Sequence, residues 1–506
     1  MTSVGTSPRL TPHAALAALD QRFLQAATVL LDPVPELPRT DHPGAVASSL
    51  LPPLIERCTG PGRRDALWLL LTAMFGALPT TEELLDFGRR LELLPAYLAQ
   101  SRLLADVLAD AGRGRLDLPM TVVSDGALVD VDHSARNDTH TGIHRVVRET
   151  TPRWRDGHGA QAVAWIDQYS AFRSLSAEEE TRIFRYGQPL PVAPDGETED
   201  GPSMLVVPWR STVVLVDVPK TAASEQLAAL ARFSGNTLAL IGYDMIPITS
   251  ADTRPFVDSV AFGQYLSVVK HAHRVAAISG SATAEFRGFA DAVRAQGLPG
   301  PEVRAVELVT EPPTEATVAP ARSDGRPVVL CTGSLEPHKN QRAVLHAAER
   351  LWREGLDFEV RLVGGHGWNE EVLRAAADRL HAAGRPLTEL GRVSDAELTA
   401  ELRAADLVVF VSLHEGYGLP VAEALACGTP VLTSDFGSQA EIARDGGCVT
   451  VDPRDDDALT EALRRLLTHP TELEVLRAEI ADRPARTWAE YADELWAYLV
   501  RGEGAA

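Results

Sequence analysis

The stretch DLVVFVSLHEGYGLPVAEALACGTPVLTSD, residues 406–435, decides the fold that we predict for this chain. Its pattern predicts a strand, a glycine-containing loop and a helix that ends at Gly428 and Pro430, before the next strand begins. Short β-branched runs alternate with helical segments in the same way from about residue 120 onward, as in TVVSDGALVDV at 121–131. Such alternation is typical of parallel sheets covered by helices on both faces.

These runs fall into two groups, which a proline-rich hinge at 310–326 separates. We therefore predict two doubly wound, Rossmann-like α/β domains facing a cleft, at 118–315 and 316–485, with ligands beyond the carboxyl ends of the strands. Residues 1–117 carry helical periodicity and are expected to form an N-terminal helical extension. Residues 486–506 are expected to form a C-terminal helix that packs back on the first domain.

The composition is that of a multi-domain globular protein. The 506 residues include 70 acidic and 48 basic side chains, and the formal charge of −22 argues against a nucleic-acid partner. The four cysteines lie far apart, so we expect buried thiols without a zinc site or a disulfide framework. The most apolar run, at 66–78, is too short to span a bilayer. No secretory signal is visible, so we expect a cytoplasmic protein, with the inner face of the membrane as an alternative.

Two carboxylates flank the loop of the opening stretch. Glu415 is predicted on the loop and Glu423 about one turn inside the helix, where its side chain points back toward the helix start. Gly416 and Gly418 allow backbone to approach a ligand closely, and a helix N-terminus offers free N–H groups to an anion. Taken alone, the two acids are explained equally well as a solvated loop acid and a helix-dipole acid.

Two further strand-to-helix loops carry similar features. In VVLCTGSLEPHKN, residues 328–340, Lys339 and Asn340 stand at a helix entry, where a lysine can pair with a diphosphate. In THTGIHRVVRET, residues 139–150, Gly142 stands between a strand and a helix. A surface lysine and an ordinary turn glycine are the alternatives. The three loops together favour one ligand that carries both phosphate and hydroxyl groups.

With these motifs, the sequence resembles the retaining glycosyltransferases of the GT-B fold, in sequence family 4. The resemblance covers about residues 120–500 and rests on TGIHRVVRE, IGYDMIP, TGSLEPHKN, RLVGGHGW, LGRVSDAEL and the run from 412 to 441. It implies a nucleotide-sugar donor, no cofactor and no required metal. The acceptor is then a glycan, a lipid-linked sugar or a small metabolite. Because TGIHRVVRE looks most like the mannosyl-transferring branch, GDP-mannose is the favoured donor.

The resemblance also implies roles for residues at matching positions. Glu415 would face the sugar hydroxyls, Glu423 the ribose and Lys339 the diphosphate, whose developing charge Asn340 would also face. The other positions implied to bind the donor are Gly142, Ser334, Arg392, Val393, Gly416, Gly418 and Leu419, with Arg392 and Val393 next to the base.

The chain departs from the family pattern at three positions. Many members have arginine where this chain has Ser334 and where it has His338, so one cation for the diphosphate is missing. Arg145 from the other domain is a candidate substitute. Many relatives also have a histidine near the sugar where IGYDMIP offers Asp244, which makes Asp244 a candidate on the acceptor side. A capping or purely structural acid is the alternative for Asp244.

Three other functions fit parts of the sequence: a metal-dependent glycosyltransferase, a non-catalytic scaffold and a dehydrogenase. Asp130 and Asp132 form a D-x-D pattern that would fit a metal-dependent glycosyltransferase of the other large fold, but their position favours strand and turn acids. A non-catalytic GT-B scaffold that binds a nucleotide or a protein partner is the alternative function. No G-x-G-x-x-G follows a strand, which disfavours a dehydrogenase.

The leucine-rich helices of residues 1–117 must pack on the catalytic body, on a second copy, or on a partner or membrane.

Overall fold

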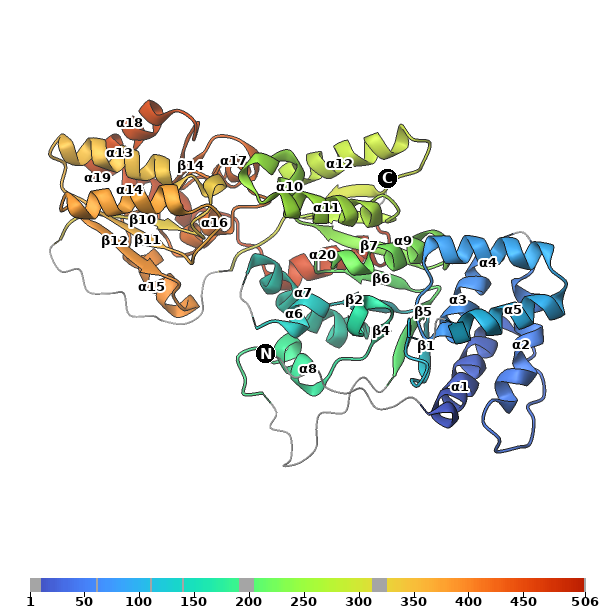
Figure 1. Ribbon diagram of the computed structural model, residues 1–506. Helices are drawn as coiled ribbons and strands as arrows, with labels where there is room; N and C mark the ends of the chain where they lie inside the picture. Colours follow the sequence, from blue (N-terminus) through green and yellow to red (C-terminus); the bar gives the residue numbers. More distant parts are fainter. Residues whose placement is uncertain are drawn as a thin grey trace.

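The computed structural model describes residues 11–60, 62–109, 112–138, 141–190, 204–311 and 325–504. Figure 1 shows an N-terminal helical region and a first α/β domain side by side, with a second α/β domain at the far end of the molecule. Each α/β domain is built on one sheet. The prediction of two Rossmann-like domains with a helical extension is therefore confirmed.

The helical region packs on the first domain. It comprises α1 (Pro12–Leu30), α2 (Ala45–Cys58), α3 (Arg64–Phe75), α4 (Thr81–Leu93) and α5 (Ala96–Ala109). Its apolar residues, such as Phe23 and Trp68, belong to the same buried cluster as Met120 and Leu205 of the first sheet. Of the packing partners expected for these helices, the structure shows the first α/β domain, whereas contact with a second copy, another partner or a membrane stays a prediction.

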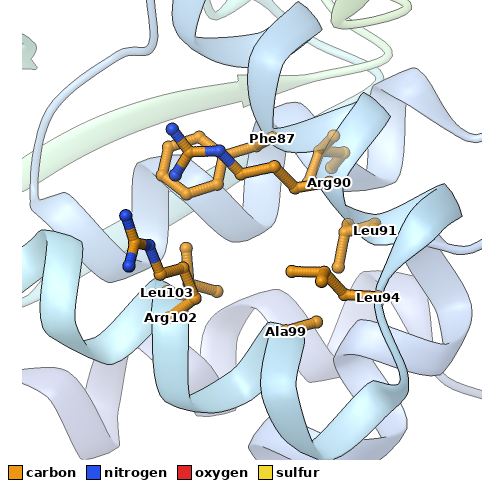
Figure 2. Close-up of a pocket in the computed structure, with 8 residues that line it drawn as sticks. Phe87, Arg90, Leu91, Leu94, Ala99, Arg102 and Leu103 are labelled. Atoms are coloured by element: carbon orange, nitrogen blue, oxygen red, sulfur yellow. The ribbon is translucent and has the colours of Figure 1, made fainter.

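The outer helices of this region are less completely covered. Leu93 and Tyr97, at the junction of α4 and α5, are 83% and 67% exposed. A small apolar pocket opens between these two helices (Figure 2), and it is lined by Leu67, Phe87, Arg90, Leu91, Leu94, Ala99, Arg102 and Leu103. No helix in the described ranges is both long and apolar enough to cross a membrane.

The first sheet has the strand order β1-β5-β4-β3-β2-β6-β7-β8-β9. The strands are β1 (Met120–Ser124), β2 (Ala127–Asp130), β3 (Gln161–Trp165), β4 (Phe172–Arg173), β5 (Leu205–Trp209), β6 (Thr212–Leu215), β7 (Thr237–Gly242), β8 (Arg274–Ala277) and β9 (Glu302–Ala305). Only β4 runs antiparallel to its neighbours in the described sheet. The run at 121–131 forms two strands that do not pair with each other: β1 pairs with β5, whereas β2 pairs with β3 and β6.

Helices cover this sheet on both faces. They are α6 (Asp132–Arg136), α7 (Gly142–His158), α8 (Ala177–Phe184), α9 (Ser224–Phe233), α10 (Ile246–Thr249), α11 (Phe256–Val269) and α12 (Gly280–Arg294), with short 3₁₀ turns η1 (Asp167–Tyr169), η2 (Thr221–Ala223) and η3 (Ala251–Thr253). Helix α7 begins at Gly142, after the end of β2 and the short α6. Its start therefore lies at the carboxyl edge of the sheet.

The second sheet is entirely parallel and has the order β12-β11-β10-β13-β14-β15. Its strands are β10 (Val328–Thr332), β11 (Glu359–Val363), β12 (Leu387–Gly391), β13 (Leu407–Phe410), β14 (Val431–Ser434) and β15 (Cys448–Val451). Its helices are α13 (Gln341–Arg353), α14 (Glu371–Ala382), α15 (Asp395–Ala404), α16 (Leu419–Ala426), α17 (Gly437–Ala443), α18 (Asp456–Thr468) and α19 (Pro470–Ala481), preceded by η4 (Pro337–Lys339). The chain leaves β10 and β13 in opposite directions, so the switch point lies between these two strands.

The last helix, α20 (Trp488–Leu499), returns to the first domain. Figure 1 shows it in red beside α7, among the elements of the first domain. The indole of Trp154 donates to the carbonyl of Ala492 at 2.8 Å, and the hydroxyl of Tyr498 donates to the carbonyl of Glu302 at 3.1 Å. Helix α20 is thus part of the first domain's core, although it follows the second domain in sequence.

Arg22 joins the helical region to the start of the first sheet. Its side chain is 1% exposed, and its guanidinium donates to the carbonyl oxygens of Ala73, Leu116 and Leu118 at 2.7, 2.9 and 2.6 Å. Burial lowers the pKa of Arg22 to about 10, and the charge of Asp117 opposes this shift. The side chain therefore remains charged at neutral pH and ties three segments together.

We expect Arg22→Met to lower the free energy of unfolding of this region by about 3 kcal/mol, because three buried carbonyls lose their donor. Hydrogen exchange of α1 and α3 measures this loss. Arg39→Met is the matched control, since the Arg39 side chain is 93% exposed, and it should change stability by less than about 0.5 kcal/mol. A loss below about 1 kcal/mol for Arg22→Met would show that Arg22 does not hold the segments together.

Candidate functional site

The switch point of the second sheet brings two predicted loops together. The N–H of Leu413, after β13, donates to the carbonyl of His338, after β10, at 2.7 Å. Next to this contact, the Lys339 ammonium lies 2.7 Å from Glu415 Oε1, with the two side chains only 16% and 10% exposed. Lys339 also lies over the Phe410 ring, 5.3 Å from its centroid. A lysine and a carboxylate are therefore held as a nearly buried pair where such sheets bind ligands.

The glycines of the HEGYG loop are required by the backbone. Gly418 has a φ of 101° as the residue that caps α16, which is left-handed backbone that glycine adopts without strain. A Cβ on Gly416 would lie 2.4 Å from the carbonyl oxygen of Tyr243, and one on Gly142 would lie 2.5 Å from Leu419. Gly416 and Gly142 were predicted to approach a ligand, and the structure places both against the opposite domain.

Among the described residues, three ion pairs cross the boundary between the domains. Arg145 on α7 lies 3.0 Å from Glu423 on α16. His414 Nε2 in the HEGYG loop lies 2.8 Å from Glu285 on α12. The third pair joins Arg254, just before α11, to Glu336, just after β10. The carboxyl edges of the two sheets are thus connected by charge as well as by backbone contact.

Asp244 is a second acid, besides Glu285, that the first domain presents to this boundary. It follows β7, is half-buried, and its Cβ would lie 3.1 Å from a Cβ on Gly416. Burial raises the pKa of Asp244 to about 6, and the charges of Glu285 and Glu415 add to this effect, while the N–H of Ile246 opposes it. Asp244 therefore gains and loses its proton close to neutral pH.

The structure gives several predicted residues a partner within the protein. The Ser334 hydroxyl donates to Glu336 at 2.9 Å, and the Asn340 amide donates to the carbonyl of Pro453 at 2.8 Å. Arg392 is exposed in the loop after β12, and the neighbouring Val393 packs on an apolar cluster of the second domain. Arg145, a candidate for the cation missing at Ser334, is paired with Glu423 instead. Donor binding by each of these residues stays a prediction.

Sequence reasoning missed both residues of two pairs, His414 with Glu285 and Arg254 with Glu336. Glu285 and Arg254 lie outside the quoted motifs, and their partners are 129 or 82 residues away by position. Glu336 and His414 stand inside the motifs SLEPHKN and LHEGYG but were given no role. The only feature of the sequence that could have pointed to Glu336 and His414 is that they are ionisable residues close to Lys339 and Glu415.

The D-x-D acids act within the first domain. The Trp165 indole donates to Asp130 at 2.8 Å, and the Trp165 backbone N–H donates to Asp132 at 2.9 Å. Burial, followed by the charge of Asp132, raises the pKa of Asp130 to about 8. Over the ranges that the structure describes, no group of three or more His, Cys, Asp or Glu side chains is placed to hold a metal ion.

Known structures identify the architecture as the GT-B glycosyltransferase fold. Trehalose-6-phosphate synthase from Burkholderia multivorans superposes with a TM-score of 0.51 at 14% identity, over 76% of this chain and 97% of that one. The Anabaena protein HepE, crystallised with UDP and glucose, gives a TM-score of 0.50 at 15% identity, over 74% and 98%. These similarities establish the fold.

Residues 314–483, which include most of the second domain, match the family model of the glycosyl transferases group 1. An O-antigen chain mannosyltransferase B of Escherichia coli is 35% identical over 150 residues, which are 29% of this chain and 39% of that protein. A GDP-mannose-dependent phosphatidylinositol monomannoside mannosyltransferase of Mycolicibacterium smegmatis is 34% identical over 185 residues, 35% and 46% of the two chains. The chain thus spans less than half of the length of the relatives that it matches.

The pair between His414 and Glu285 should make stability depend on pH. Burial alone would lower the pKa of His414, but the hydrogen bond and charge of Glu285 raise it. The contribution of the pair is therefore complete below about pH 6.5 and is lost as the pH rises through the folded-state pKa. We expect Glu285→Gln to cost about 1 kcal/mol of unfolding free energy at about pH 6 and less than half of that at about pH 9.

Urea denaturation at both pH values measures this difference. Glu441→Gln is the matched control, because Glu441 accepts the N–H of Gly280 across the same boundary at 2.8 Å and has no titrating partner there. Its cost should be the same at both pH values. An equal cost of Glu285→Gln at both pH values would contradict a charged His414.

Proposed function

We propose that this protein is a retaining glycosyltransferase that moves a sugar from a nucleotide-sugar donor to an acceptor. The observation that carries the proposal is the nearly buried pair of Lys339 and Glu415 at the switch point, beside the start of α16. A diphosphate needs a cation and free N–H groups, and a sugar needs a carboxylate for its hydroxyls. The pair supplies the cation and the carboxylate, and the start of α16 offers the backbone N–H of Leu419, although Pro420 has no N–H and the N–H of Val421 donates to the Gly418 carbonyl at 2.9 Å.

In this proposal the donor lies across the carboxyl edge of the second sheet. Lys339 and the N-terminus of α16 face the diphosphate, and Glu415 accepts hydrogen bonds from the sugar hydroxyls. Glu423 faces the ribose after exchanging its contact with Arg145, and the backbone at 392–393 meets the base. Gly142 approaches the diphosphate from the first domain with its backbone, because the Leu419 side chain fills the space where a Cβ of Gly142 would lie.

The proposed chemistry depends on stabilising the leaving group. The bond between the anomeric carbon and the diphosphate oxygen breaks, and the acceptor oxygen bonds to the same face of that carbon. The acceptor proton passes to the departing phosphate oxygen, so the protein need not supply a nucleophile. Lys339 and the helix N-terminus stabilise the charge that develops on the diphosphate, which is usually the largest catalytic contribution. Asp244 holds the acceptor hydroxyl from the first domain.

Mannose is the sugar that we propose, with GDP-mannose as donor. The support is that the relatives described above are named mannosyltransferases, one of them GDP-mannose-dependent. The acceptor is proposed to be a glycan, a lipid-linked sugar or a small metabolite, and the compartment to be the cytoplasm. A screen of nucleotide-sugars for hydrolysis and thermal stabilisation tests the donor. Binding without hydrolysis or transfer would instead favour the non-catalytic scaffold.

We expect Glu415→Gln to keep the fold and to reduce kcat by roughly 10²-fold, which corresponds to about 2.7 kcal/mol of transition-state stabilisation. The amide still fills the site but no longer balances the charge of Lys339. Glu354→Gln is the control, because Glu354 pairs with Arg464 near the opposite end of α13. A rate of Glu415→Gln within about threefold of wild type would rule out the proposed role of Glu415.

We also expect transfer to continue at the full rate after treatment with EDTA, because Lys339 and backbone N–H groups neutralise the diphosphate in this proposal. Rates with and without EDTA, measured on the same donor, check this. Complete loss of activity that added Mn²⁺ restores would show that a metal ion takes the role given to Lys339.

A further inference from the structure

Ser334 is connected through Glu336 to an arginine of the facing domain. Glu336 accepts a hydrogen bond from the Ser334 hydroxyl on Oε1, and its Oε2 pairs with the guanidinium of Arg254. Arg254 stands between η3 and α11 of the first domain, and its other terminal nitrogen lies 2.8 Å from Asp258. The Glu336 carboxylate therefore lies between the guanidinium of Arg254 and Ser334, which follows β10.

Arg254 and Lys339 lie around the same buried group. The imidazole of His338 has Glu336 at 3.4 Å, and the charges that act on it come from Lys339, Glu415, Glu336 and Arg254. Burial first, and Lys339 next, lower the pKa of His338 to about 4. His338 is therefore neutral at pH 7, and the positive charges on this side of the site belong to Lys339 and Arg254.

We propose that Arg254 is a diphosphate-binding residue that the first domain contributes to the donor site. This inference rests on the proposed function. On donor binding, the Arg254 guanidinium exchanges Glu336 for diphosphate oxygens. A guanidinium matches phosphate oxygens with two parallel N–H donors, so the exchange keeps its hydrogen bonds and gains charge complementarity.

The surroundings of Arg254 allow this exchange. The Arg254 and Glu336 side chains are 28% and 18% exposed, so a ligand in the boundary can reach both. Asp258 belongs to the same domain as Arg254 and keeps the guanidinium in place after Glu336 is released. The release of Glu336 also frees the Ser334 hydroxyl to donate to a phosphate oxygen. Glu336 thus acts as the internal stand-in for the anion.

Calorimetry on the full chain with GDP, GMP, UDP and UMP tests this role. The comparison uses the nucleotides whose base wild type binds. We expect Arg254→Gln to lower the affinity for the nucleoside diphosphate by about tenfold or more, and the affinity for the monophosphate by no more than about twofold. Arg254→Lys keeps the charge but loses the two parallel N–H donors of the guanidinium. Its affinity for the diphosphate should lie between those of wild type and Arg254→Gln. Arg294→Gln is the control, since Arg294 is 50% exposed on α12 and pairs only with Asp291 among the ion pairs of the described residues.

Two further variants act in the opposite direction. Glu336→Gln removes the competing carboxylate and should tighten diphosphate binding by about threefold. Ser334→Arg, added to Arg254→Gln, should restore most of the lost affinity, because it places a guanidinium at the end of β10. Glu336→Gln tests the site even if Arg254→Gln folds poorly, because it leaves Arg254 in place.

The outcomes separate the two proposals. If wild type binds none of the four nucleotides, the proposed function fails. If wild type binds a diphosphate and Arg254→Gln binds it equally well, the role of Arg254 is wrong and the proposed function stands. Equal losses for diphosphate and monophosphate would make Arg254 a contact that only holds the domains together, which also overturns the inference.

Discussion

The contact between Gly416 and the carbonyl oxygen of Tyr243 sets the geometry on which the rest of the site depends. No side chain fits between these two backbones, so the HEGYG loop of one domain lies directly on the end of β7 of the other. The Ser279 hydroxyl reinforces the contact by donating to the Gly416 carbonyl at 2.6 Å. Because the carboxyl edges of both sheets meet here, Asp244 and Glu415 face one boundary although they belong to separate domains.

Charge at this boundary is balanced locally, within a protein whose overall charge is strongly negative. Lys339, Arg145, Arg254 and His414 each pair with a carboxylate, and all but the first pair join the two domains. In the proposed function, an anionic donor therefore competes with carboxylates that already hold the cations that it needs. Such exchange keeps the cations in place before binding, and it favours ligands whose charge exceeds that of a single carboxylate.

The fold was largely predictable, because β-branched runs and helical periodicity recur along most of the chain. Four strands were missed. Of these, β4 has two residues and β9 reads EVRA, so both lack that signal, as does β12, which reads LTELG; β15 was missed although its sequence, CVTV, is rich in β-branched residues. The run at 121–131 forms two strands because the chain turns at Asp125 and Gly126. As a result, β1 lies at the edge of the sheet and β2 lies near its centre. Lys339 and Glu415 could be found from motifs. The pairing of Arg254 with Glu336 could not, because contacts between distant segments leave no local pattern.

The position of α20 has a consequence for biosynthesis. The second domain is one continuous segment, so it can complete its core as soon as α19 has been synthesised. The first domain cannot, because Tyr491 and Tyr498 of α20 are fully buried in its core and are made after the whole second domain. The domain that begins first on the ribosome is thus completed last. Until then, apolar residues of the first domain that α20 covers, such as Trp154 on α7, lack their packing partner.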